Sequence, residues 1–292
     1  MVKPEGFGNN RPAGPLKPAP GGSILPGMEA IRPEAVAGLF YPGERSALQR
    51  EVSGLLEWAR TQETPGQTPP RAVVAPHAGY PFSGALAARA YAHIAPFAER
   101  YQRVLLLGPS HRVPLRGLAA STAGAFRTPL GDIALDRREC EALVALANVE
   151  QRDDAHAHEH SLEVHLPFLQ TLLGDFRLIP VVVGDASARQ VAPVIERYWD
   201  DPATLIVIST DLSHFLDYDR ARAVDRRTCD AVEALDYNAL AHEQACGRNP
   251  LRGLLAVAKD RGAGATTLGL YNSGDVTGDR SRVVGYGAWL VQ

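Results

Sequence analysis

The sequence predicts an α/β fold, a single three-layer α/β/α domain around a largely parallel central sheet. Two observations carry this prediction. Short runs of apolar, mostly β-branched or leucine residues alternate with segments whose apolar residues recur at helical spacing. These runs are apolar at consecutive positions, which is typical of strands that helices cover on both faces. Alternation of such strands with helices indicates a parallel sheet between two helical layers.

Regular structure is expected to begin near Arg32. The first predicted helix spans residues 44–60, because its apolar residues recur at intervals of one or two helical turns. The segment 64–70, which contains three prolines, interrupts this pattern. Four strand-like runs follow, and each ends in a turn with polar, glycine or proline residues: 72–75, 104–107, 178–183 and 205–208.

Further helices are predicted between and after these runs: 84–94, 188–199 and 251–259, with two more around Cys140 and Cys229. The chain is predicted to close with two strands, 266–271 and 281–291, joined by a turn at 273–275. No internal repeat and no linker interrupts the later part of the chain. We therefore expect residues 28–292 to form one domain.

The first 27 residues differ from the rest, since they hold six prolines and six glycines among few apolar side chains. Such a segment cannot bury enough apolar surface to offset its ordering entropy, which predicts a disordered N-terminal extension over 1–27. The N-terminus also lacks the pattern of a secretory leader. With three cysteines and no C-x-x-C pair, the chain is expected in the reducing cytoplasm.

Charge and hydropathy exclude two classes of partner. Lys plus Arg number 30 and Asp plus Glu number 33, a net charge of −3, so the chain lacks the basic excess of a nucleic-acid binder. The longest apolar runs are far shorter than the ~20 residues of a membrane-spanning helix. Neither a nucleic acid nor a membrane is expected as a partner.

Polar residues with catalytic chemistry follow three of the predicted strands. His77 comes after the run 72–75, His111 after 104–107, and the pair Asp211 and His214 after 205–208. In open α/β sheets, ligands bind in the crevice beyond the carboxyl ends of the strands. One histidine after a strand is commonly a turn residue, but several that share a crevice indicate a divalent-metal site or an acid–base site.

A second histidine cluster lies at residues 153–165. His156 and His158 are expected in a solvated loop without a role. The segment 161–169 has helical spacing, and His160 or the residue after it is a candidate cap for that helix.

His160 and Glu163 are three residues apart, which would place them on one helix face. Either side chain could face the crevice, and the spacing leaves this open.

The role of Cys246 is equally open, because this residue lies just before the predicted helix 251–259. A thiol at a helix N-terminus has its thiolate form favoured, which suits nucleophilic or metal-binding chemistry. It can equally pack as a small apolar side chain. Cys140 and Cys229, inside amphipathic helices, are expected to be inert.

Seven blocks, in co-linear order over about residues 32–292, together resemble the Memo family, whose prokaryotic members are called AmmeMemoRadiSam system protein B: 35–42, 75–80, 108–111, 159–168, 209–214, 246–247 and 273–279. The family is similar in fold to the class III extradiol dioxygenases, the LigB-like group, which agrees with the predicted three-layer domain. In those enzymes a 2-His-1-carboxylate set holds non-haem Fe(II), and another histidine acts as acid–base.

The resemblance implies roles for five residues of this chain. His77 and His111 take the imidazole positions, and Cys246 stands where the dioxygenases have a glutamate. Asp211 lines the same pocket, and His214 takes the acid–base position. A thiolate is softer than a carboxylate, so the site would suit Fe(II) first, with copper or zinc as alternatives.

These implications favour a metal-binding, oxidoreductase-like protein that acts on an unidentified small molecule or peptide. One alternative is a non-catalytic module that captures a peptide or an anionic partner in the same pocket, with help from Arg112. The other is a zinc hydrolase in which His214 or Glu163 activates metal-bound water. The family's association with a radical SAM protein and an AMMECR-type protein suggests both as partners.

Overall fold

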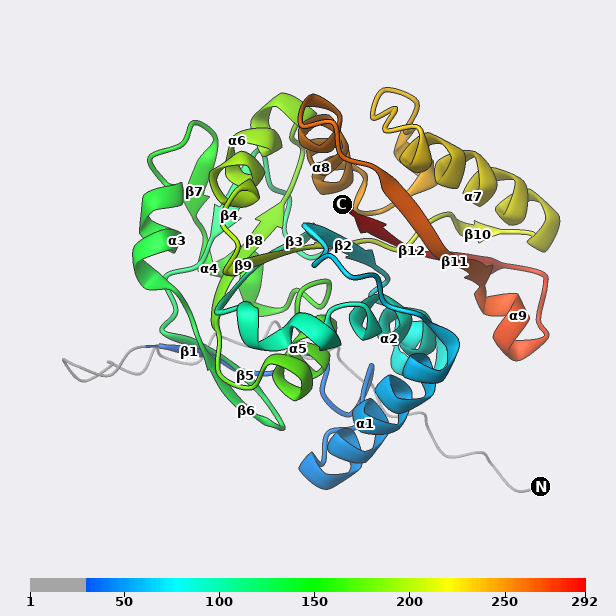
Figure 1. The fold of residues 1–292 in the computed structure, drawn as a ribbon, viewed down its shortest axis with the longest axis horizontal. Helices are drawn as coiled ribbons and strands as arrows, with labels where there is room; N and C mark the ends of the chain where they lie inside the picture. Colours follow the sequence, from blue (N-terminus) through cyan, green and yellow to red (C-terminus); the bar gives the residue numbers. More distant parts are fainter. Residues whose placement is uncertain (1–29) are drawn as a thin grey trace, which may run out of the picture.

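The computed structural model describes residues 30–292, so the predicted extension over 1–27 lies outside the described residues (Figure 1). Within the described chain a nine-stranded sheet forms the centre, in the order β10-β12-β2-β9-β3-β8-β4-β7, with β11 paired to β12. Its strands are β2 (Ala72–Ala75), β3 (Arg103–Pro109), β4 (Leu118–Ala120), β7 (Val149–Gln151), β8 (Arg177–Val183), β9 (Thr204–Ser209), β10 (His214–Leu216), β11 (Ala265–Asn272) and β12 (Val283–Val291).

The middle of this sheet is parallel, as predicted. β2 pairs with β9, β9 with β3, and β3 with β8, all in parallel register. Every residue of β2 and of β9 is buried, because helices cover both faces. Antiparallel pairs occur toward the margins, where β12 joins β2, β10 and β11, and β4 joins β8.

Two helical layers enclose the sheet, which confirms the three-layer architecture (Figure 1). One layer holds α1 (Arg45–Gln62), α2 (Ala85–Ala92) and α5 (Leu166–Leu173). The other holds α6 (Ala188–Trp199), α7 (Tyr218–Glu233) and α8 (Arg248–Asp260).

Shorter elements complete the described chain: the helices α3 (Arg137–Leu143), α4 (Asp153–Ala157) and α9 (Ser273–Thr277), the π-helical turn η1 (Tyr80–Gly84), the 3₁₀ turns η2 (Ala95–Arg100), η3 (Glu163–His165) and η4 (His242–Gln244), and a small sheet of β1 (Ile31–Arg32), β5 (Ala125–Thr128) and β6 (Gly131–Ala134). Cys140 in α3 and Cys229 in α7 are free and buried, and burial raises the pKa of Cys140 to about 12.

Two predicted boundaries are wrong for local reasons. The helix predicted at 251–259 already begins at Arg248, because Pro250 falls in its first turn, where proline is tolerated. The turn predicted at 273–275 is the start of α9. Asn272 caps it by accepting a hydrogen bond from Gly274 N at 2.9 Å, while Asp275 accepts one from Asn272 N at 2.9 Å.

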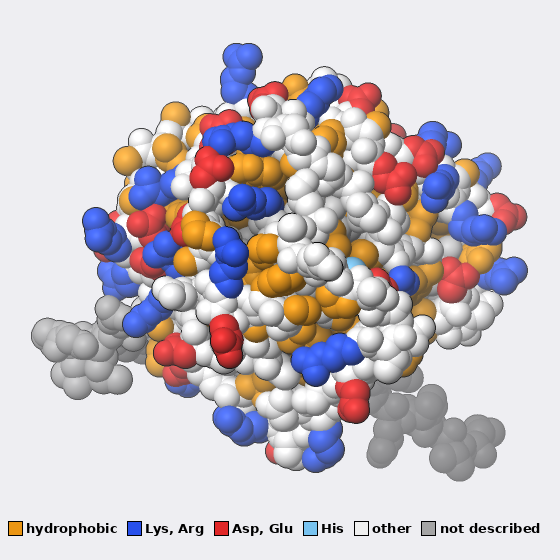
Figure 2. All heavy atoms as spheres, viewed as in Figure 1, with side chains coloured by type: hydrophobic (Ala, Val, Ile, Leu, Met, Phe, Trp, Pro, Cys, Tyr) orange, Lys and Arg blue, Asp and Glu red, His pale blue; other side chains and the backbone are white. Residues whose placement is uncertain are grey.

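The surface carries no single-sign field on the face that Figure 2 shows, where basic and acidic side chains are interspersed around an apolar centre. Within residues 30–292, no helix combines the length and the apolar character that a bilayer crossing requires.

Candidate metal centre

Three parallel strands each deliver a chemistry-bearing side chain two residues after they end. His77 follows β2, His111 follows β3 and Asp211 follows β9. Because parallel strands present their carboxyl ends at one edge of the sheet, these residues converge. The ring centroids of His77 and His111 are 5.2 Å apart.

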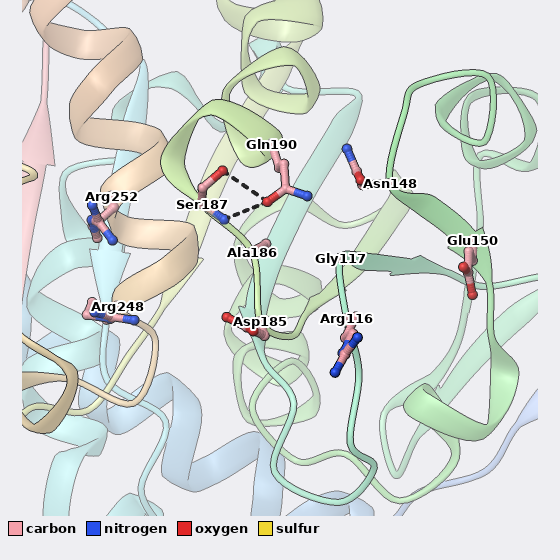
Figure 3. A pocket seen from close by; sticks show the side chains of 10 residues that line it. All are labelled: Arg116, Gly117, Asn148, Glu150, Asp185, Ala186, Ser187, Gln190, Arg248 and Arg252. Carbon is pink, nitrogen blue, oxygen red and sulfur yellow. Dashed lines mark hydrogen bonds between the residues drawn. The ribbon is translucent and has the colours of Figure 1, made fainter.

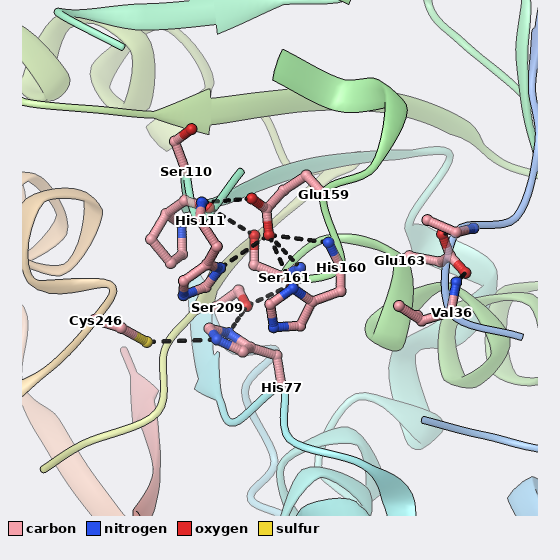
Figure 4. A network of polar contacts seen from close by, with 12 residues as sticks. Val36, His77, Ser110, His111, Glu159, His160, Ser161, Glu163, Ser209 and Cys246 are labelled. Carbon is pink, nitrogen blue, oxygen red and sulfur yellow. Dashed lines mark hydrogen bonds and ion pairs between the residues drawn. The ribbon is translucent and has the colours of Figure 1, made fainter. Parts of the chain in front are cut away.

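His160 joins them, which spacing alone had left open (Figure 4). Its ring centroid lies 4.6 Å from that of His111 and 5.4 Å from that of His77. One ligand nitrogen from each of the three rings lies within 4.8 Å of the other two. Three imidazoles at this separation can hold one metal ion.

His160 and Glu163 do not share a helix face, and neither His160 nor Ser161 caps a helix, so both predictions are wrong. His160 N and Ser161 N donate to the carboxylate of Glu159 at 2.9 Å each. The Ser161 hydroxyl donates to Pro109 O at 2.9 Å, which holds the segment against the end of β3. The chain therefore turns here, and regular helix begins only after the 3₁₀ turn η3.

In two of the rings Nδ1 donates a hydrogen bond, so Nε2 is the nitrogen that can ligate a metal. The Ser209 hydroxyl donates to Ser161 O at 2.6 Å, so it accepts from His77 Nδ1, also 2.6 Å away. His111 Nδ1 donates to Glu159 Oε1 at 2.9 Å. Fixing the proton on Nδ1 directs the lone pair of Nε2 to a metal.

Burial favours the neutral form of His77 and of His160, which is the form that ligates a metal. Burial, followed by the neighbouring His111 and His160, lowers the pKa of His77 well below its ordinary value. Burial and His111 lower the pKa of His160 to about 4. The buried Nδ1 of His160 has no hydrogen-bond partner in the described chain. Glu159 Oε1 lies 3.3 Å from this nitrogen, and the Cys246 thiol lies 3.4 Å from His77 Nε2. Together with His111 Nε2, these two nitrogens form a donor set that fits a metal.

Glu159 is the site residue that the sequence reasoning missed, although it lies directly before His160. Its side chain is 1% exposed and accepts from His111 N at 2.6 Å as well as from the ring of His111. Burial by itself raises the pKa of Glu159, but the hydrogen bonds from His111 and the nearby amides bring it to about 2. A buried carboxylate thus orients two of the three histidines.

Glu159→Gln is expected to lower metal affinity about 10–100-fold, the range for groups that orient a ligand. An amide has one acceptor oxygen where the carboxylate has two, so it cannot serve all four donors. Titration of metal-free protein with Zn(II) measures the effect. Glu150→Gln, a change at an exposed position, is the control. A folded Glu159→Gln protein with unchanged affinity would show that Glu159 does not support the site.

Cys246 lies at the edge of the three-histidine cluster. Its Sγ is 3.4 Å from His77 Nε2 and accepts from Asp211 N at 3.3 Å. Burial raises the pKa of the thiol, so a metal would have to displace its proton. Gly247 permits this placement, because a Cβ there would come 2.3 Å from Ser209 O.

Asp211 and His214 lie beside the cluster. Asp211 Oδ1 accepts from His77 N at 2.8 Å, and its Oδ2 is 3.9 Å from His77 Nε2. Burial raises the pKa of Asp211 to about 7, against the lowering effect of the His77 and Ala78 amides. His214 Nδ1 donates to Leu212 O at 2.7 Å, which leaves its Nε2 free, and burial lowers its pKa.

Glu163 holds the segment 32–41 in place through its side chain, which is turned away from the cluster (Figure 4). It pairs with the Arg32 guanidinium, and it accepts from Tyr41 Oη at 2.6 Å and from two amides of the same segment. The segment in turn places Phe40 against His160, with ring centroids 4.9 Å apart. With its oxygens committed to these donors, Glu163 is not the base that the zinc-hydrolase hypothesis needs.

The two histidines that precede His160, His156 and His158, differ in exposure. His158 is exposed, as predicted. His156 is 1% exposed in α4, so its assignment to a solvated loop is wrong. Its Nε2 donates to Ala119 O at 3.0 Å, which ties α4 to β4, and burial lowers its pKa to about 4.

Comparisons with known proteins identify relatives over nearly the whole described chain. A family model described as Memo-like protein matches residues 32–290. A MEMO1 family protein of Thermoplasma acidophilum is 39% identical over 267 residues, covering 87% of this chain and 96% of that protein. One of Methanopyrus kandleri is 38% identical over 280 residues, covering 88% and 97%. An uncharacterized protein of Escherichia coli K12 shares the fold alone, with a TM-score of 0.51 and 14% identity over 76% of this chain and 99% of that chain.

Proposed function

This chain belongs to the Memo family, and from that premise we propose that it is a metal-dependent oxidoreductase. His77 and His111 bind Fe(II), or alternatively copper, and Cys246 supplies the third donor. The observation that carries the proposal is the pair of imidazoles whose Nδ1 atoms are hydrogen-bonded, with a thiol sulfur 3.4 Å from His77 Nε2. Two imidazoles and a soft thiolate suit a redox-active metal.

The chain's own residues prepare this site before any ion binds. Bound iron or copper would supply one-electron chemistry toward oxygen or a small molecule. Asp211 holds the backbone of His77 through its amide. His214, with Nδ1 bonded to a carbonyl, has its Nε2 free to accept and return a proton. The carboxylate of Glu159 keeps His111 in the ligating tautomer.

His160 favours a second candidate, a zinc hydrolase. Three imidazoles with an open fourth position are a common donor set of catalytic zinc. In that arrangement His77, His111 and His160 hold the ion and Cys246 is left outside. His214 would then be the base that activates zinc-bound water.

Metal analysis of protein purified without oxygen separates the two candidates. We expect about one iron or copper ion per chain. Cys246→Ser should weaken Cu(I) binding most, because an alcohol is a harder donor and stays protonated. His160→Ala, measured in parallel, should have the smaller effect on Cu(I).

Stoichiometric zinc, together with a large loss in His160→Ala and none in Cys246→Ser, would overturn the oxidoreductase and support the hydrolase. A protein that takes up no iron, copper or zinc would overturn both.

A further inference from the structure

A cavity of about 600 Å³ opens beside Cys246. One wall is the loop that follows His111, including Val113, Pro114 and Leu115. The start of α8, with Arg248 and Asn249, forms another wall. Because Cys246 lies against His77, this cavity borders the candidate metal centre.

A second cavity, of about 670 Å³, shares Asp185 and Arg248 with the first (Figure 3). It is lined by three arginines, Arg116, Arg248 and Arg252, and Asp185 lies between Arg248 and Arg116 in the view. Arg248 is the basic residue that faces both cavities.

The positive charge of Arg248 is poorly compensated. Arg248 lies in the first turn of α8, where the helix dipole disfavours a cation. The first turn of α8 contains no acidic residue that could offset this effect. Arg252, one turn later, adds a like charge at the unfavourable i, i+4 spacing. Its Nε donates to Tyr237 O at 2.8 Å, so Arg252 is held in place.

Among residues 30–292, Arg248 has no ion pair within 4.0 Å and no side-chain hydrogen bond. Burial and Arg252 lower its pKa, while Asp185 and Glu243 act in the opposite direction. The buried Oδ1 of Asn249 is also without a hydrogen-bond partner in this part of the chain, while its Nδ2 donates to Gly184 O at 2.8 Å. Polar groups held without partners in a cavity are typical of a binding site.

We propose that the cavity beside Cys246 is the substrate pocket of the metal centre, and that its substrate is a small molecule with a terminal oxyanion, a carboxylate or phosphate, which Arg248 binds. The planar guanidinium matches either group with two parallel hydrogen bonds. The apolar body of the substrate packs against Val113 and Leu115, and its reactive end lies toward Cys246. This inference rests on the proposed function in that it assigns the pocket to the metal centre.

The test uses the full-length, metal-free protein, so that it does not depend on which metal binds. Isothermal titration with inorganic phosphate and with butyrate measures oxyanion binding. We expect one anion per chain for at least one of the two probes. Arg248→Gln should lower its affinity about tenfold or more, because a charge-assisted hydrogen-bond pair is lost. The affinity of Arg248→Lys should lie between those of wild type and Arg248→Gln, since lysine keeps the charge but lacks the planar guanidinium that makes two parallel hydrogen bonds.

Two further variants make the test specific. Asp185→Asn should raise the affinity for the anion, because it removes a negative charge from the cavity that Asp185 and Arg248 both line. Arg50→Gln, an equal change of charge on the exposed side of α1 in the opposite helical layer, should leave it unchanged (Figure 1). A response to phosphate alone assigns a phosphorylated substrate, and a response to butyrate alone assigns a carboxylate.

Failure of both probes to bind at millimolar concentration, or equal affinity in wild type and Arg248→Gln, would overturn the proposal. Metal content, measured separately, should be the same in Arg248→Gln as in wild type. An empty metal site with intact anion binding would count against the proposed function alone.

Discussion

Replacing His77 with alanine is expected to abolish stoichiometric metal binding. His77 belongs to both donor sets that the site offers, the three imidazoles and the pair of imidazoles with Cys246. Removal of a direct ligand should lower metal affinity by more than the 10–100-fold that removal of an orienting group causes. Metal content after dialysis against a weak chelator measures it.

His111→Ala should behave in the same way, because His111 is also common to both sets. His158→Ala is the matched control, since His158 is exposed and lies only two residues from His160. His156→Ala is unsuitable as a control because it removes a buried hydrogen bond to Ala119 O. His77→Gln, which leaves a smaller cavity, guards against loss of folding. Wild-type metal content in folded His77→Ala would place the metal elsewhere.

Glu163→Gln is expected to have the largest effect on stability. Glu163 is fully buried against Arg32, so loss of its charge leaves the guanidinium uncompensated in the interior. Breaking such a pair costs about 3–5 kcal/mol of unfolding free energy. In a chain of this size the melting temperature should fall by on the order of 10 °C.

Glu141→Gln provides the control, because Glu141 forms an i, i+4 pair with Arg137 at 60% exposure of its side chain. Surface pairs of this kind contribute little to stability. Thermal unfolding of metal-free protein followed by circular dichroism compares the variants. Equal melting temperatures in Glu163→Gln and Glu141→Gln would show that the 32–41 segment is held by other contacts.

The central strands and the major helices could be predicted because their signals are local. The run 205–208 is apolar at each position, and β9 is buried throughout. The predicted helix 188–199 is α6 with the same limits. The convergence of His77, His111 and Asp211 was also predictable, since parallel strands end at one edge of the sheet.

The second half of the site could not be predicted in this way. His160 and Glu159 lie in a turn between α4 and η3, and their side chains reach the cluster only because the turn packs against the end of β3. A three-residue spacing suggested a shared helix face for His160 and Glu163, but no helix forms there. His156, read as a loop residue, is buried because α4 packs on β4.

By itself, the sequence determined the layer architecture, the strands that carry His77, His111 and Asp211, and the edge at which they meet, because periodicity and strand direction are properties of neighbouring residues. Only the tertiary structure decided that His160 completes a cluster, that Glu159 orients it and that Glu163 serves as a buried anchor. Those roles depend on contacts between segments far apart in the chain, such as Glu163 with Arg32 and Ser161 with Pro109, and no local pattern encodes such contacts.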